Sequence, residues 1–142
     1  GGTPRAAGGG PVGMTANSFA SLSLEPPLVL WSISRRATHF EAFTRATGFA
    51  VHVLDAGQEA LARRFAARGV DRFADLATTT LVTGAPVLER FHACFDCRLH
   101  ALYEGGDHLI VVGEVLRIEQ RPGGPLVFHQ GRYGALAGQP AP

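Results

Sequence analysis

Short apolar runs separated by turn-forming residues fill most of the chain. Residues 28–33 (LVLWSI) follow the pair Pro26-Pro27, and their length and β-branched content predict a strand buried on both faces. Residues 49–54 (FAVHVL) follow Gly48 and predict a second buried strand. Three further strands are predicted at residues 93–103, 109–119 and 126–130, because Gly105-Gly106 and the PGGP sequence at 122–125 break these runs as hairpin turns do.

Helical spacing is found in two segments. Residues 39–47 place Phe40 and Phe43 three apart, and Thr38 is expected to cap this short helix. Asp55 is expected to cap a second helix within residues 56–69, and Gly69 has the place of a left-handed C-terminal residue. The predicted apolar stripe of this second helix consists of Leu61, Ala62, Phe65 and Ala66.

The predicted strands outnumber the helices, and the last three strands are consecutive. This order is typical of an antiparallel barrel or sandwich decorated by helices, and it is not the order of a doubly wound α/β sheet. The length of 142 residues suits one domain spanning residues 1–142. The predicted fold class is therefore mainly β, with decorating helices.

Composition narrows the class of protein further. The chain has 18 glycines and 9 prolines, which agrees with many turns, and 46% of its residues are apolar, enough for a core. Its formal net charge of +1 gives no electrostatic reason to expect a nucleic-acid or membrane partner. No apolar run approaches the ~18 residues of a membrane span, and two cysteines are too few for a disulfide-stapled secreted domain. We expect a soluble, cytoplasmic protein.

Cys94 and Cys97 form a CxxC motif, so a redox or zinc site is one hypothesis. Positions three apart on a strand point to opposite faces, which would separate the two thiols. No second CxxC or HxxxH pair completes a zinc site. We favour ordinary strand cysteines, with Cys97 facing inward beside Phe95 and Leu99.

Polar groups gather at three places beside the predicted strands. Residues 13–19 (GMTANSF) carry small polar side chains that can hydrogen-bond the edge of a heterocycle. Residues 32–38 (SISRRAT) end a strand with hydroxyls and two guanidiniums, which suits a phosphate, although a solvated basic loop explains them equally well. His108 lies at a hairpin tip where Asp107 can orient its ring, and ordinary turn chemistry is the alternative. The six histidines have no metal-ligand spacing, so no metal is expected.

Taken in order, these motifs closely resemble the short-chain flavin reductases, small NAD(P)H:flavin oxidoreductases that supply reduced flavin to two-component monooxygenases. The resemblance covers roughly residues 12–136. It rests on residues 13–30 (GMTANSFASLSLEPPLVL), 32–37 (SISRRA), 49–54 (FAVHVL), 64–66 (RFA), Cys97, 106–108 (GDH), 113–115 (GEV) and 125–133 (PLVFHQGRY).

The resemblance implies an FMN-binding split β-barrel of the antiparallel Greek-key type, and a homodimer with flavin near the subunit interface. It assigns flavin binding to Thr15, Ala16, Asn17, Ser18, Phe19, Ser32, Ile33, Ser34, Arg35, Arg36, Ala37, Phe65 and Ala66. It assigns nicotinamide binding to Gly106, Asp107, His108, Gly131, Arg132 and Tyr133. Family members usually have a helix and a strand ahead of Gly13, so we expect this chain to lack them. His52 stands where many members carry Asn and receives no role.

The expected reaction is hydride transfer from C4 of the nicotinamide of NADH or NADPH to N5 of FMN or FAD, with the rings stacked about 3–3.5 Å apart. His108 and Tyr133 would then position the nicotinamide, and reduced flavin would pass to a partner monooxygenase. One alternative is a non-catalytic flavin-binding or electron-transfer protein on the same barrel, which would not oxidise NADH when free flavin is added. A second is a thiol redox protein whose activity needs Cys94 and Cys97.

Overall fold

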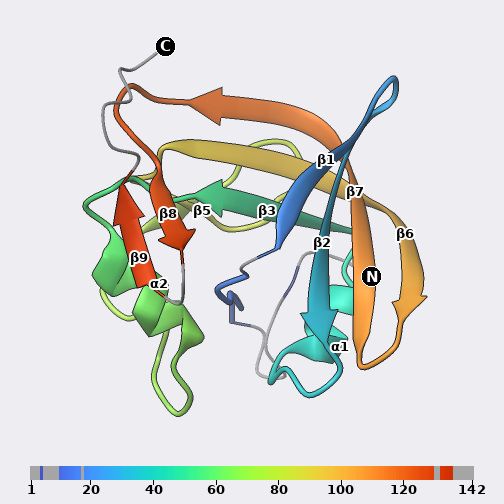
Figure 1. The fold of residues 1–142 in the computed structure, drawn as a ribbon, viewed down its shortest axis with the longest axis horizontal. Helices are drawn as coiled ribbons and strands as arrows, with labels where there is room; N and C mark the ends of the chain where they lie inside the picture. Colours follow the sequence, from blue (N-terminus) through green and yellow to red (C-terminus); the bar gives the residue numbers. More distant parts are fainter. Residues whose placement is uncertain (1–3, 5–9, 17, 130–131, 136–142) are drawn as a thin grey trace.

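A strongly curved antiparallel sheet makes up most of the molecule, and two short helices lie below it in the view of Figure 1, one at the left and one at the right. The computed structural model describes residues 4, 10–16, 18–129 and 132–135, with backbone alone for 128–129 and 132–135. The elements are β1 (Phe19–Leu24), β2 (Pro27–Ser34), α1 (Phe40–Thr44), β3 (Gly48–Val53), α2 (Glu59–Ala66), β4 (Thr78–Thr79), β5 (Val87–Leu88), β6 (Ala93–Gly105), β7 (His108–Gln120), β8 (Leu126–His129) and β9 (Arg132–Ala135).

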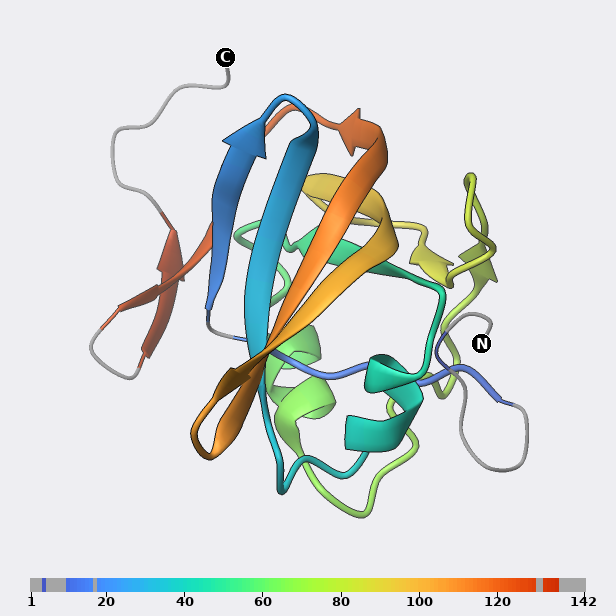
Figure 2. The same cartoon turned by 90° about the vertical axis from the view of Figure 1, so that its right-hand side faces the viewer.

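The main sheet has five strands in the order β1-β2-β7-β6-β3, and every neighbouring pair is antiparallel. Figure 2 shows β1, β2, β7 and β6 side by side, with the turn between β6 and β7 at one end of the sheet. Two small sheets, β4-β5 and β8-β9, complete the described strands. The prediction of a mainly β, antiparallel fold is confirmed.

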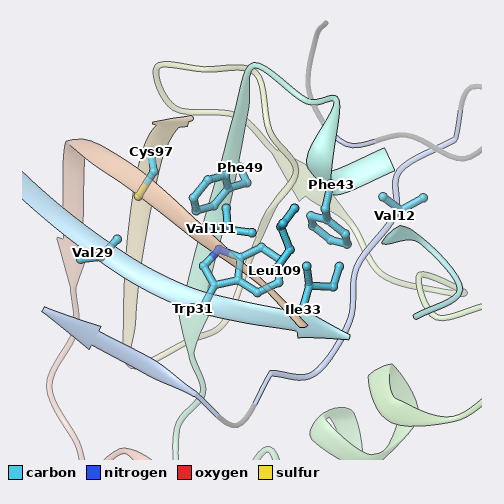
Figure 3. Close-up of a cluster of buried hydrophobic side chains, with 9 residues drawn as sticks. All are labelled: Val12, Val29, Trp31, Ile33, Phe43, Phe49, Cys97, Leu109 and Val111. Carbon is cyan, nitrogen blue, oxygen red and sulfur yellow. The ribbon is translucent and has the colours of Figure 1, made fainter. Parts of the chain in front are cut away.

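The core lies against one face of β2. Val29, Trp31 and Ile33 are buried, whereas the residues between them are half-buried. In Figure 3 these three side chains lie on one side of β2, and Trp31 packs edge-on against Phe43 and Phe49, with ring centroids 5.4 and 5.8 Å away. The prediction that this strand is buried on both faces was therefore wrong, because in the described chain its second face has only partial cover and the side chains alternate between the two faces.

Both helices begin later than their sequence patterns predicted. The first begins at Phe40, after His39, and no side chain caps it, so Thr38 is not its cap. The second begins at Glu59, after Gln58. Asp55 instead accepts a hydrogen bond from the N–H of Gly57 at 2.9 Å and forms an ion pair with a distant arginine. The predicted cap at Asp55 was therefore wrong, because tertiary contacts hold this residue in a turn instead.

The two cysteines are free and fully buried, and they lie in different clusters. Cys97 belongs to the main core, with Phe95 and Leu99 packed against it, as predicted. Cys94 packs instead with Val87 and its neighbours in a second cluster. Burial, helped by the nearby Asp96 carboxylate, raises the pKa of each thiol to about 12. Thiols in this state are protonated at neutral pH and poor nucleophiles.

Candidate flavin and nicotinamide site

The segment before β1 is fastened to α2. The N–H of Thr15 donates to the carbonyl of Phe65 at 3.2 Å, and the Thr15 hydroxyl donates to the carbonyl of Ala62. Arg72 donates to the carbonyl of Gly13 at 2.8 Å. At Gly13 a Cβ would lie 2.5 Å from the Phe65 ring, so only glycine allows this approach. Two parts of the predicted flavin set that are distant in sequence are thereby brought together.

A cavity of about 490 Å³ lies beside this segment. Four residues of the predicted flavin set line it: Thr15, Ala16, Phe19 and Phe65. Much of the remaining wall comes from β3 and α2, and most of it is apolar. An apolar wall with a few polar groups suits a flat heteroaromatic ring. The residues present therefore fit a flavin ring at this place.

Two residues that line the cavity, Trp31 and His52, were not predicted as site residues. Trp31 lines it, and its buried Nε1–H has no acceptor within the part of the chain that the structure describes. His52, on β3, lines it too, and its Nε2 accepts a hydrogen bond from the N–H of Leu88 at 3.0 Å. Burial, followed by the charge of Arg121, lowers the pKa of His52 to about 4, so the ring is neutral at physiological pH. The polar residue inside the apolar run 49–54 was the sequence signal for His52.

A pair of serines connects the two segments of the predicted flavin set, residues 15–19 and residues 32–37. The hydroxyls of Ser18 and Ser32 lie 2.9 Å apart, and the N–H of Ser32 donates to Ser18 Oγ at 3.2 Å. Beyond β2 the chain turns sharply, since the N–H of Ala37 donates to the carbonyl of Ser34 at 3.0 Å. Ile33 is fully buried, backbone included, and its side chain packs in the main core.

The two arginines that follow β2 have different surroundings. Arg35 is bound to the turn between β6 and β7: its N–H donates to the carbonyl of Asp107 at 3.0 Å, and its Nε donates to the carbonyl of Gly106 at 3.1 Å. Its guanidinium also forms an ion pair with Glu104. Arg36 is exposed, and its guanidinium has no partner among the residues described. Of the two, Arg36 is the side chain that is open to an added anion.

The predicted nicotinamide turn lies directly beside the end of β2. His108 pairs in register with Ser34, and Gly106 has a φ of +74° that suits glycine. His108 Nδ1 lies 2.8 Å from Asp107 Oδ1. An ionised carboxylate only accepts hydrogen bonds, so Nδ1 carries the proton and Nε2 stays available. The hydrogen bond from His108 lowers the pKa of Asp107 below its ordinary value.

Several members of the predicted set are not tested by these contacts. Asn17 and Gly131 lie outside the described residues, and Arg132 and Tyr133 lie on β9, where the backbone alone is described. Ala66 ends α2, next to Phe65, and is exposed. These roles, like those of the rest of the predicted set, stay predictions.

Comparison with known proteins decides the family. Residues 2–137 match the family model described as "Flavin reductase like domain". The chain belongs to this flavin reductase-like family. It is 48% identical over 130 residues to the FMN reductase (NADH) SmoA of Agrobacterium fabrum, covering 92% of this chain and 74% of that protein. It is 38% identical over 129 residues to HsaB of Rhodococcus jostii, the reductase subunit of a flavin-dependent monooxygenase, covering 90% of this chain and 66% of that subunit.

Solved structures of the family agree with the fold of this flavin reductase-like domain. The NADH:FAD oxidoreductase SgcE6 of Streptomyces globisporus, in complex with NAD and FAD fragments, superposes with a TM-score of 0.83 at 41% identity. The match covers 89% of this chain and 82% of that one. The expected split-barrel fold is confirmed. In the described part of the flavin reductase-like domain, no helix is long and apolar enough to cross a membrane.

Proposed function

We propose that this flavin reductase-like domain is an NAD(P)H:flavin oxidoreductase that binds flavin along residues 15–37 and α2 and binds the nicotinamide at the turn before β7. One observation carries the arrangement: the pairing of Ser34 with His108 places the loop that follows β2 beside that turn. A flavin with its phosphate at this loop would therefore have the nicotinamide turn close by.

The flavin would be held by groups of three kinds. The apolar wall around Phe65 accommodates the ring. The amide of Asn17 stays the sequence-based candidate for a hydrogen bond to the polar edge of the ring. The Arg36 guanidinium supplies a planar, charged donor for the phosphate. Bound flavin supplies the redox chemistry, since its ring accepts a hydride from a reduced nicotinamide.

The chain itself contributes positioning. Asp107 fixes the tautomer of His108 and leaves Nε2 free to contact the incoming nicotinamide nucleotide. A hydride needs no general base, so His108 acts by placing the donor ring, where small errors of distance reduce the rate strongly. The buried thiols take no part, because their raised pKa values keep them protonated.

We also propose a homodimer that passes reduced flavin to a separate monooxygenase. The likeness to a monooxygenase reductase subunit supports the partner. Exposed apolar side chains on the long strands, Tyr103 and Ile118 among them, are available to an interface between subunits. A cytoplasmic location stays a prediction.

The proposal is tested by following NADH and NADPH oxidation at 340 nm with added FMN or FAD, together with flavin binding by fluorescence quenching. We expect flavin-dependent oxidation of at least one nicotinamide. Tight flavin binding with no oxidation of either nucleotide would instead identify a flavin carrier and overturn the proposed activity.

A further inference from the structure

The two arginines after β2 are adjacent in sequence, yet only one of them has its guanidinium committed to another part of the chain. Arg35 reaches the turn between β6 and β7, whereas Arg36 extends into solvent without a partner among the described residues. Residue type alone would make both guanidiniums candidate phosphate ligands. Their hydrogen bonds and ion pairs differ, however, and so distinguish the two residues.

Arg35 makes three contacts with the residues that lead into His108. Its backbone N–H binds the carbonyl of Asp107 at 3.0 Å, its Nε binds the carbonyl of Gly106 at 3.1 Å, and its Nη2 pairs with the Glu104 carboxylate. The carbon of its guanidinium lies 5.9 Å from the centroid of the Phe40 ring, within the range of a cation–π contact. The planar fork of arginine is what allows the carbonyl and the carboxylate to be bound together.

The turn consists of two residues, Gly106 and Asp107, between the paired strand residues Gly105 and His108. Gly106 has a φ of +74° and no side chain, and the Asp107 side chain is 95% exposed, so neither turn residue packs a side chain against the sheet. His108 takes its direction from this backbone and from Asp107. A guanidinium bound to the Gly106 carbonyl therefore limits where the imidazole can lie.

We propose that Arg35 is a positioning residue for the nicotinamide, and that Arg36 alone of the pair gives its guanidinium to the flavin phosphate. Arg35 acts through the turn: it holds residues 104–107 against the end of β2 and so fixes His108. The proposal rests on the proposed function, since it assigns separate tasks within that same site.

The test compares Arg35→Ala with the matched variant Arg36→Ala. For Arg35→Ala we expect KM for the nicotinamide to rise about fivefold or more at saturating flavin, with the flavin Kd changed less than threefold. For Arg36→Ala we expect the reverse, a flavin Kd raised about tenfold or more with KM little changed. Thermal melting of both variants checks that the fold is kept.

Arg35→Lys separates charge from geometry. Lysine keeps the positive charge but cannot bind the carbonyl and the carboxylate with one planar group. We expect KM to stay raised in this variant, whereas a phosphate ligand would recover most of its flavin affinity. A tenfold loss of flavin affinity in Arg35→Ala, restored by lysine and with KM unchanged, would overturn the proposal.

Amide hydrogen exchange gives a readout that does not need turnover. We expect faster exchange in residues 104–108 of Arg35→Ala and unchanged exchange there in Arg36→Ala. If wild-type protein oxidised no nicotinamide, the proposed function would fail, while this exchange result would still support the contact between Arg35 and the turn. Equal exchange of residues 104–108 in the wild type and in Arg35→Ala would contradict the positioning role itself.

Discussion

Ser34, the last residue of β2, pairs directly with His108, the first residue of β7. The pairing joins two loops that leave the same end of the sheet, one with two arginines and the other with the imidazole. The hydroxyl of Ser34 adds to this junction, since it accepts a hydrogen bond from the N–H of Arg36 at 3.2 Å. The two loops are neighbours because of the register of the sheet.

Replacing His108 with Ala should raise KM for the nicotinamide and leave the flavin Kd nearly unchanged. A reduction in kcat of up to about 10²-fold is expected, because a misplaced donor ring loses alignment. Asp107→Asn is the milder control, since its amide oxygen can still accept from His108 Nδ1. Steady-state kinetics and a flavin titration of each variant give the answer. Loss of flavin binding with normal KM would place His108 in the flavin site instead.

His52 should make the protein less stable in mild acid. Its pKa is about 4 in the folded chain and 6.5 as the ordinary value, so the unfolded chain binds the proton first as the pH falls. Stability is therefore complete above about pH 7, declines between pH 6.5 and 4, and loses about 3 kcal/mol in total. Urea denaturation at several pH values measures this slope.

The control for this effect is His52→Gln, whose amide oxygen can accept from the N–H of Leu88 without titrating in this range. We expect the part of the slope between pH 6.5 and 4 that belongs to His52 to disappear. An unchanged slope would assign the acid sensitivity to other groups.

Gly113→Ala should destabilise the fold by about 1–3 kcal/mol through overpacking. A Cβ there would lie 2.6 Å from Phe49 Cζ and 2.9 Å from Cys97 Cβ, and both neighbours are buried in the main core. Gly124→Ala is a matched control, because a Cβ there meets nothing within 4 Å. Urea denaturation of the two variants should differ clearly. Equal stability of the two variants would mean that Phe49 and Cys97 move enough to accommodate the added methyl group.

Cys94 and Cys97 should resist thiol reagents in the native protein. Both are fully buried, and each has its pKa raised to about 12. With an aromatic disulfide reagent at pH 8 we expect no fast reaction in buffer and two reactive thiols in denaturant. Rapid labelling of the native protein would return the thiol redox hypothesis to consideration.

The strands β2, β3, β6, β7 and β8 were predictable because their apolar runs and the turn residues that break them are local signals. The strands β1, β4, β5 and β9 were not predicted. The turn at Gly106 was predicted from the glycine pair, and the separate burial of the two cysteines was predicted from strand periodicity. Helix starts were not predictable in the same way: the Asp55 carboxylate is engaged by Arg90, which lies far along the chain. The half-buried face of β2 was not predicted, because a largely apolar run does not show which of the two faces of the strand points into the core.

The site was only partly predictable, for a related reason. Residue types suggested a heterocycle and a phosphate, and the family resemblance added Phe65 and Ala66 to the predicted flavin set. The structure joins Phe65 to Thr15 through a backbone hydrogen bond that neither source predicted. The different contacts of Arg35 and Arg36 depend on a turn about seventy residues away, which no local pattern encodes. His52 acquires its low pKa from a burial that exists only once β3 is packed.

The sheet order also bears on how the site comes into being during folding. The hairpins β1-β2 and β6-β7 each form from nearby residues, whereas the contact between β2 and β7 closes a loop of about half the chain. Each hairpin carries one half of the proposed site. Fragments cut within residues 80–90 would each retain a hairpin, yet neither would bring a flavin and a nicotinamide together until the two reassociate. Redox activity is thus tied to the most non-local step in assembling the sheet.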